Sequence, residues 1–345
     1  MRIVCIGLAF AALAAPMAAK AAEHPAYGLE LEGFDYPHEV KRFEFVSQGR
    51  TMSMAYMDVA PRASGDATPN GRTVALLHGK NFCAATFERQ IRVLSEAGFR
   101  VVAIDQIGFC KSTKPDGYQF SFQQLAQNTH ALLASLGVDK AVVLGHSMGG
   151  MLAARYALMF PAATERLVMV NPLGLEDWKA KGVPYATIDK LNETELKTTF
   201  ESVKAYQLKF YYDGQWKPEY DRWVEMNAGM YKGAGARQVA WIGALTHEMI
   251  YTQPVVYEFP ELKVPTTLMI GQTDRTAPGA NRAPKEVAAT LGDYAALGKA
   301  AAKAIPGATL VEFPGRGHSP HVEAPEEFDA ALLKALSASP AKTAP

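Results

Sequence analysis

Short apolar runs separated by helix-length amphipathic stretches constrain the fold of this 345-residue chain more than any other feature. Four such runs lie at residues 74–77, 101–104, 141–144 and 167–170, and two more follow at 267–270 and 309–313. Continuous apolar runs are typical of strands that are buried on both faces of a parallel sheet, with the intervening helices covering those faces. A last helix is expected from Pro325 to Leu336. The sequence therefore predicts an α/β fold with helices on both faces of a sheet.

Two segments depart from this alternation. Residues 40–47 and 51–59 alternate apolar and polar side chains, which is typical of a half-buried antiparallel pair. Residues 173–262 lose the strand pattern and read as several helices rich in aromatic side chains. We interpret most of these aromatic side chains as the core of an inserted helical cap, and we expect several to line a pocket. The core then comprises residues 22–172 and 263–336, and the polar, proline-containing tail 337–345 is expected to be disordered.

The first 21 residues have the properties of a secretory signal peptide. Arg2 precedes an apolar run at residues 3–15, and small residues stand at 19–21 where a signal peptidase would cut. The run is too short to span a bilayer comfortably, so a retained membrane anchor is the weaker alternative. We expect export to the periplasm or secretion. The mature chain would keep Cys83 and Cys110, an even pair in an oxidising compartment.

Charge and motif content exclude several classes of function. Lys plus Arg and Asp plus Glu each total 35, so no basic footprint for nucleic acid or anionic membrane is present. The chain has no phosphate-binding glycine loop or dinucleotide fingerprint. His247-Glu248 is followed by Tyr251 where a zinc helix needs histidine, and His318 with His321 has no further ligands nearby. No metal, cofactor or stable membrane insertion is therefore expected, and the oligomeric state has no signal.

The segment Gly145-His146-Ser147-Met148-Gly149 carries the strongest chemical signal. It follows a buried strand and opens a helix, which is the setting of a nucleophilic serine on a sharp turn. Gly145 and Gly149 give that crowded backbone its room. The sequence predicts Ser147 as the nucleophile.

A serine hydroxyl needs a general base to become nucleophilic. His318 follows the last predicted strand and is the preferred base, with His321 and His78 as alternatives. The base needs a carboxylate to orient it, and Asp274 after the strand 267–270 is preferred.

Glu176 and Asp177, which follow an earlier strand, are the alternatives to Asp274.

The tetrahedral intermediate also needs two backbone donors. The amide of Met148 is expected to be one, and the amide of Lys80, or else that of Asn81, the other. We expect the side chain of Lys80 to point into solvent, although it could instead attract a substrate carboxylate.

These pieces, taken in order, resemble the α/β-hydrolase family over nearly the whole mature chain. The resemblance is carried by His78-Gly79, by residues 105–112 (DQIGFCKS), by GHSMG, by 271–278 (GQTDRTAP) and by 317–325 (GHSPHVEAP). It implies a mostly parallel eight-stranded sheet with a helical cap inserted after strand six, and it assigns the triad roles to Ser147, Asp274 and His318. Members with a nucleophilic aspartate are excluded because position 147 is serine.

The resemblance also concerns the two cysteines of the mature chain. Cys83 and Cys110 would lie in the loops after the neighbouring strands three and four, so a disulfide that holds the oxyanion loop is expected. Two buried free thiols are the alternative.

The function implied is a serine hydrolase that cleaves a small or medium carboxylic ester or lactone through an acyl-enzyme. The small-molecule acyl substrate is expected to have an apolar or aromatic portion. A C–C bond hydrolase and an amidase or peptidase would use the same triad, and a non-catalytic binding module is the alternative outside enzyme classes.

Overall fold

The computed structural model describes residues 24–62 and 68–337. The predicted signal peptide (1–21) and residues 338–345 of the predicted tail lie outside the described residues. Among the described residues no helix is both long and apolar enough to cross a membrane.

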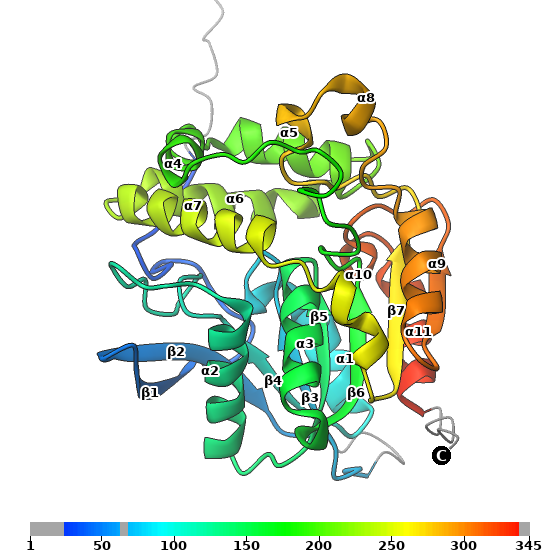
Figure 1. The fold of residues 1–345 in the computed structure, drawn as a ribbon. Coiled ribbons are helices and arrows are strands. Elements are labelled where there is room, and N and C mark those ends of the chain that lie inside the picture. Colours follow the sequence, from blue (N-terminus) through cyan, green and yellow to red (C-terminus); the bar gives the residue numbers. More distant parts are fainter. Residues whose placement is uncertain (1–23, 63–67, 338–345) are drawn as a thin grey trace, which may run out of the picture.

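The core of the fold is one eight-stranded sheet (Figure 1). Its strands lie in the order β1-β2-β4-β3-β5-β6-β7-β8. Their bounds are β1 Lys41–Ser47, β2 Arg50–Val59, β3 Thr73–Leu77, β4 Arg100–Ile104, β5 Ala141–His146, β6 Thr164–Val170, β7 Thr266–Gly271 and β8 Thr309–Phe313. β2 pairs antiparallel with β1 and β4, and the remaining neighbours are parallel. The predicted α/β class with a mostly parallel sheet is confirmed.

Alternate side chains of each central strand enter two separate apolar cores, one on each face of the sheet. Val142 and Leu144 of β5 pack with α1 (Glu88–Glu96) and α11 (Pro325–Ser337). Ala141 and Val143 face the opposite way, into a core shared with α2 (Phe122–Ser135), α3 (Met148–Met159) and α9 (Tyr294–Ala304). Burial on both faces explains why these strands have no polar alternation in the sequence.

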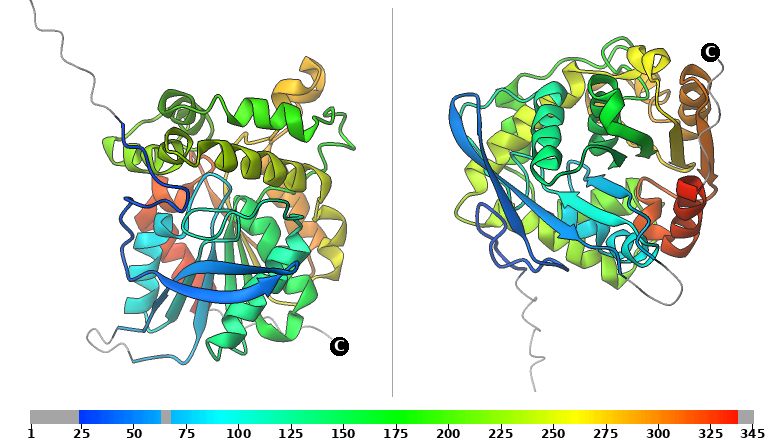
Figure 2. Two further views of the ribbon diagram at one scale, coloured as in Figure 1. Left: turned by 90° about the vertical axis from the view of Figure 1, so that its left-hand side faces the viewer. Right: turned by 90° about the horizontal axis from the view of Figure 1, so that it is seen from below.

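Four helices between β6 and β7 form a cap over one end of the sheet (Figures 1 and 2). They are α4 (Ile188–Glu195), α5 (Phe200–Phe210), α6 (Asp221–Lys232) and α7 (Ala236–Thr252). The remaining helices are short: α8 Lys285–Ala288, α10 Pro320–Glu323, and the 3₁₀ turns η1 Ala84–Phe87, η2 Pro161–Ala163, η3 Pro218–Tyr220, η4 Val256–Glu261 and η5 Ala280–Arg282. The strands of the parallel part end on the cap side, so the loops that follow them face the cap.

An N-terminal strap, residues 24–36, connects the cap with the sheet. The Tyr27 amide donates to the Gly229 carbonyl of α6 at 2.9 Å, and Lys232 Nζ donates to the His24 carbonyl at 2.7 Å. Further along the strap, Leu31 is fully buried in the core below.

Candidate active site

Ser147 stands on the turn between β5 and α3. Its φ of 57° lies in the left-handed region that a residue with a Cβ rarely adopts, so the turn is strained. The neighbouring glycines are required by close packing: a Cβ at Gly145 would lie 1.9 Å from the Gly149 carbonyl oxygen, and a Cβ at Gly149 would lie 2.2 Å from the Leu77 carbonyl oxygen. Glycine at positions 145 and 149 therefore allows the close packing of this turn, and the turn places the Ser147 hydroxyl beyond the end of the sheet.

The structure brings Ser147, His318 and Asp274 into one hydrogen-bonded chain. His318 Nε2 lies 2.8 Å from Ser147 Oγ, and His318 Nδ1 lies 2.6 Å from Asp274 Oδ2. A carboxylate oxygen accepts, so the proton of the imidazole is on Nδ1 and the serine hydroxyl donates to Nε2. His318 and Asp274 are both fully buried, which shields this chain from bulk water.

The carboxylate of Asp274 is fixed by two further donors. The Thr276 amide donates to Oδ1 at 2.7 Å, and Asn171 Nδ2 donates to Oδ2 at 2.9 Å. Asn171 directly follows β6 and also accepts from the Gly271 amide at 2.8 Å, so it spans the ends of two neighbouring strands. These donors hold the carboxylate of Asp274 in one orientation.

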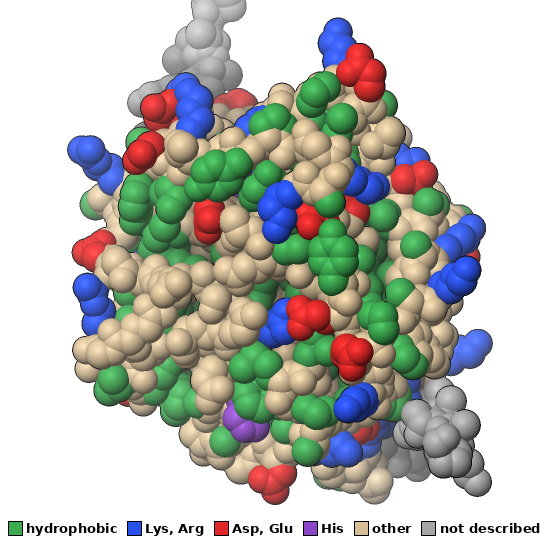
Figure 3. Space-filling model, in the orientation of Figure 1, with side chains coloured by type: hydrophobic (Ala, Val, Ile, Leu, Met, Phe, Trp, Pro, Cys, Tyr) green, Lys and Arg blue, Asp and Glu red, His purple; other side chains and the backbone are tan. Residues whose placement is uncertain are grey.

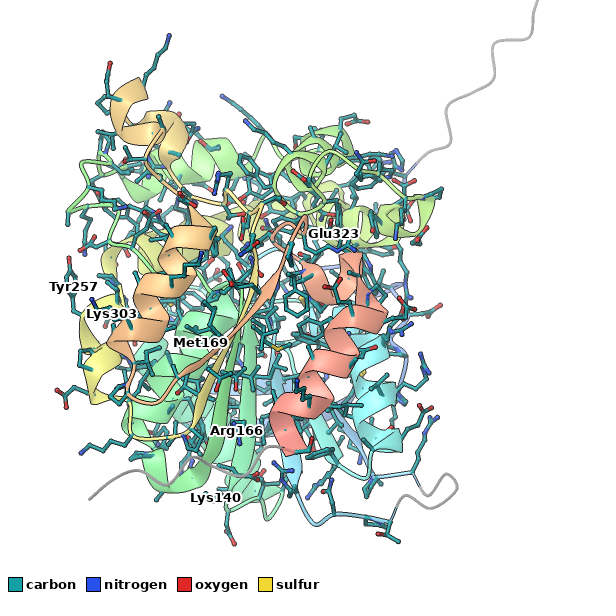
Figure 4. The ribbon with its side chains drawn as sticks, turned by 90° about the vertical axis from the view of Figure 1, so that its right-hand side faces the viewer. Lys140, Arg166, Met169, Tyr257, Lys303 and Glu323 are labelled. Atoms are coloured by element: carbon teal, nitrogen blue, oxygen red, sulfur yellow. A yellow bond between two sulfur atoms is a disulfide. The ribbon has the colours of Figure 1, made fainter. Side chains whose placement is uncertain are left out.

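Three hydrogen bonds hold the loop that carries His318. The His318 amide donates to the Phe210 carbonyl at the end of α5 at 3.1 Å. His146 Nε2 donates to the His318 carbonyl at 2.9 Å, which places the only proton of that neutral ring on Nε2. Burial, followed by the nearby His321 and His318, lowers the pKa of His146 well below its usual value. Glu323, labelled on the cap side of Figure 4, accepts from the Gly317 amide at 2.7 Å.

Neither of the alternative bases is hydrogen-bonded to Ser147, whose partner is His318. His78 Nε2 accepts from the Gln106 amide at 3.1 Å and Nδ1 donates to the Gly79 carbonyl at 2.8 Å, so both of its nitrogens serve the backbone. His321 is buried among aromatic rings, and neither of its ring nitrogens has a partner among the described residues.

The alternative acids also lie elsewhere. Glu176 binds Trp178, Lys181 and the Gly292 amide. Asp177 instead accepts from the Lys179 amide and from the hydroxyl of Tyr257.

The loop after β3 lies directly against the serine. A Cβ at Gly79 would stand 2.9 Å from Ser147 Cβ, and Lys80 and Asn81 line the same cavity as Ser147. Met148 begins α3, and the first amides of a helix have no acceptor within it. The roles of Met148 and of Lys80, or Asn81, as oxyanion donors stay predictions.

A bond between Cys83 and Cys110 closes the far end of this loop. Their Cα atoms lie 5.8 Å apart, inside the range that a disulfide spans. The bond joins the segment after β3 to the segment after β4, and both cysteines are buried.

The described residues offer one cluster with the spacing of metal ligands, His78, Asp105 and Cys110. Each group is already engaged: Cys110 is in the disulfide, and Asp105 accepts from the amides of Ala84 and Lys111. This cluster is a structural support of the loop rather than a vacant metal site.

A cavity of about 480 Å³ leads from Ser147 into the cap. Its apolar wall contains Leu173, Tyr206, Phe210, Tyr211, Tyr231 and Ile250. Other cap aromatics, Tyr212, Tyr220 and Trp223, are buried in the core instead. Some aromatic side chains of the cap therefore line the cavity and others form the core of the cap, as the sequence predicted.

The expectation for the side chain of Lys80 was wrong. Its Nζ does not point into solvent but lies 2.7 Å from Glu195 Oε1, and both side chains are largely buried. The reason is that α4 of the cap brings a carboxylate over the loop after β3. The sequence pattern contains no sign of this partner 115 positions away.

The surface has no dominant sign of charge on the face shown in Figure 3, where basic and acidic side chains are interspersed. This agrees with the equal numbers of acidic and basic residues in the sequence. This face therefore has no region of one sign that would steer a charged partner.

This chain is similar in sequence and in fold to several known proteins. The model of the alpha/beta hydrolase family matches residues 74–331. The crystal structure of a probable hydrolytic enzyme from Pseudomonas aeruginosa PAO1 is 59% identical, with 91% of this chain and 99% of that chain covered and a TM-score of 0.89.

Two further matches are more distant. The AB hydrolase superfamily protein YisY of Bacillus subtilis (strain 168) is 25% identical over 274 residues, which covers 77% of this chain and 91% of YisY. An esterase from Exiguobacterium antarcticum has a TM-score of 0.64 at 20% identity, with 83% of this chain and 96% of that chain covered, and this likeness is one of fold alone.

Proposed function

This chain belongs to the alpha/beta hydrolase family, and from that premise we propose that it cleaves a small or medium carboxylic ester, or a lactone, through an acyl-enzyme on Ser147. The observation that carries the proposal is the chain of two hydrogen bonds from Ser147 Oγ through His318 to Asp274. The 59% identity to a probable hydrolytic enzyme supports the hydrolytic part of the proposal.

The proposed reaction proceeds in two halves. Ser147 Oγ attacks the acyl carbonyl while His318 Nε2 takes the serine proton, and Asp274 stabilises the imidazolium that results. His318 then gives this proton to the leaving alcohol, which leaves the acyl group on Ser147. In the second half a water molecule attacks the acyl-enzyme while His318 Nε2 takes a proton from it. The bond between Ser147 Oγ and the acyl carbon then breaks, His318 returns the proton to Ser147 Oγ, and the carboxylic acid is released. The amides of Met148 and of Lys80, or Asn81, would donate to the oxyanion in both halves.

The size and lining of the cavity support a small organic substrate. A volume of about 480 Å³ lies within the usual range of roughly 300–1,000 Å³ for small-molecule sites. The aromatic side chains of its wall suit an apolar or aromatic part of the acyl or alcohol group.

We also propose that the protein is exported to the periplasm or secreted. The basic start and apolar run of residues 1–21 support this, as does a disulfide next to the active site, because disulfides persist in oxidising compartments. N-terminal sequencing of protein isolated from the periplasm should give a start near residue 22, and an intact N-terminus would contradict the proposal.

The function is tested with an ester panel of graded acyl length and aromaticity, run on the mature protein. Ser147→Ala should lower kcat by about 10³-fold or more. Ser135 is an exposed serine at the end of α2, so Ser135→Ala is the matched control and should have wild-type activity.

A fluorophosphonate should label wild type at Ser147. Turnover of a vinylogous diketone or of aminoacyl arylamides, but of no ester, would move the assignment to C–C or amide cleavage, and absence of any adduct would indicate a binding module.

A further inference from the structure

A polar cluster lies inside the cavity that holds Ser147. It consists of Lys80 from the loop after β3, Glu195 from α4, Tyr231 from α6 and His247 from α7, and all four side chains line the cavity. Lys80 Nζ lies 2.7 Å from Glu195 Oε1, and the hydroxyl of Tyr231 donates to Glu195 Oε2 at 2.6 Å. The single carboxylate is thus bound at both oxygens.

The helices of the cap leave a defined space for this carboxylate. A Cβ at Gly243 of α7 would lie 2.8 Å from both Glu195 Oε2 and Glu195 Cδ. A side chain at position 243 would therefore push the Glu195 carboxylate out of its present position. The cluster is a built feature of the cap interior and not a chance meeting of two surface charges.

The charges within the cluster compensate one another. Burial favours a raised pKa for Glu195, but the Lys80 ammonium and the Tyr231 hydroxyl outweigh it, and the pKa of Glu195 is lowered. Burial, followed by the positive charge of Lys80, lowers the pKa of His247 to about 4, so this ring is neutral at pH 7. At neutral pH the cluster holds one ammonium and one carboxylate, with no net charge.

The cluster keeps hydrogen-bonding capacity despite this neutrality. An ammonium has three donors, and a carboxylate oxygen accepts more than one hydrogen bond. Lys80 and Glu195 each keep a minor part of their side chains exposed, at 17% and 14%. His247 Nε2 is buried and has no partner among the described residues.

We propose that this polar cluster selects the substrate: it binds an uncharged hydrogen-bonding substituent, such as a hydroxyl or carbonyl group, and rejects an anionic one. The inference rests on the proposed ester hydrolysis and adds the class of substrate. A neutral hydroxyl can donate to Glu195 and accept from Lys80. A substrate carboxylate would instead meet the carboxylate of Glu195 in a poorly hydrated place, where like charges repel strongly.

Lys80 alone would indicate the opposite preference. A lysine beside a nucleophilic serine is a ready partner for a substrate carboxylate, but here its charge is already taken by Glu195. The selectivity therefore depends on the negative partner. Removal of the charge of Glu195, with its shape kept, should shift the selectivity toward the carboxylate.

The test uses benzyl acetate and methyl 3-phenylpropanoate, each with hydrogen, hydroxymethyl or carboxylate at the para position. Values of kcat/KM are divided by the rate of alkaline hydrolysis of the same ester, which removes electronic effects. Wild type should prefer the hydroxymethyl ester over the carboxylate ester by at least about 10-fold in one of the two series. Glu195→Gln should raise the relative rate of the carboxylate ester by about 10-fold or more, and added salt should weaken that gain.

Two variants separate charge from packing. Glu193→Gln changes an exposed carboxylate on the same helix and should leave the ratio of rates unchanged. Tyr231→Phe removes a hydrogen bond to Glu195 without a change of charge. It should weaken the preference for the hydroxymethyl ester over the unsubstituted ester by about 2- to 10-fold, and the rate of the carboxylate ester relative to the unsubstituted ester should not rise.

Each result decides the proposal. A wild type that hydrolyses the parent esters but prefers the carboxylate, or shows no preference, overturns the selectivity while the proposed function stands. An unchanged ratio in folded Glu195→Gln also overturns it, and if that variant does not fold, the ratios of wild type and Tyr231→Phe decide. If no ester is hydrolysed, the proposed function fails, and the binding of the same compounds to Ser147→Ala, measured by ligand-observed NMR, decides the selectivity alone.

Discussion

Removal of the Cys83–Cys110 disulfide should cost a large part of the stability of the fold. The bond closes a loop with a sequence separation of 27 residues. In the chain-entropy relation, such a loop corresponds to about 3.5 kcal/mol at 25 °C. With a urea slope of about 3 kcal/mol per M, the midpoint of unfolding should fall by about 1 M. Because Cys83 directly follows the loop with the predicted oxyanion donors, kcat should also fall, by up to about 100-fold.

The assay compares urea unfolding and ester turnover of wild type, reduced wild type and Cys83→Ala/Cys110→Ala. Reduced wild type keeps both sulfurs, so it separates the loss of the bond from the loss of buried side-chain volume. All three proteins are alkylated under denaturing conditions, and the number of alkylated cysteines in each is measured by mass spectrometry. Two alkylated cysteines in unreduced mature wild type, or equal midpoints for wild type and the double variant, would refute the reasoning.

Three further predictions concern the triad and its surroundings. Asp274→Asn should lower kcat by about 10⁴-fold with little change in melting temperature, because an amide can donate to His318 Nδ1 and so favours the wrong tautomer; a loss below about 10-fold would contradict the assigned acid. Asn171→Ala removes a donor to the Asp274 carboxylate and should lower kcat/KM by about 10-fold or more, with Asn171→Asp as a second variant that keeps the size but not the donor. Burial and the nearby His318 lower the pKa of His321 to about 3, so the unfolded chain binds its proton near pH 6.5 and the folded chain only near pH 3. The free energy of unfolding should therefore fall as the pH is lowered through this window, by up to about 1.4 kcal/mol per pH unit for this ring. Urea midpoints at pH 7 and pH 5 should differ less in His321→Leu than in wild type, and an equal difference would contradict the explanation.

The sheet and the positions of the three triad side chains follow from local patterns. Ser147, Asp274 and His318 each lie in the turn or loop that follows a strand that the apolar runs reveal. The carboxyl ends of parallel strands meet at one edge of a sheet, so sequence order alone brings these residues together. Asn171 occupies the same kind of position after β6, and a search for polar residues at every strand end would have indicated it.

The interior of the cap could not be predicted in this way. The Lys80–Glu195 pair depends on the direction in which α4 crosses the loop after β3, and helix periodicity fixes only which face is apolar. The need for glycine at position 243 likewise appears only when α4 and α7 are packed together. The hydrogen bond from the His318 amide to Phe210 is a backbone contact, which leaves no trace in side-chain type.

That backbone contact has a consequence for protein engineering. The end of α5 touches the loop that carries His318 directly, since the His318 amide binds the Phe210 carbonyl and a Cβ at Gly317 would stand 2.6 Å from the Tyr211 carbonyl oxygen. A chimaera that exchanged residues 173–262 for the corresponding segment of a relative would alter turnover together with specificity. Grafts that keep the last turn of α5 should retain turnover, because they keep the carbonyl that the His318 amide binds.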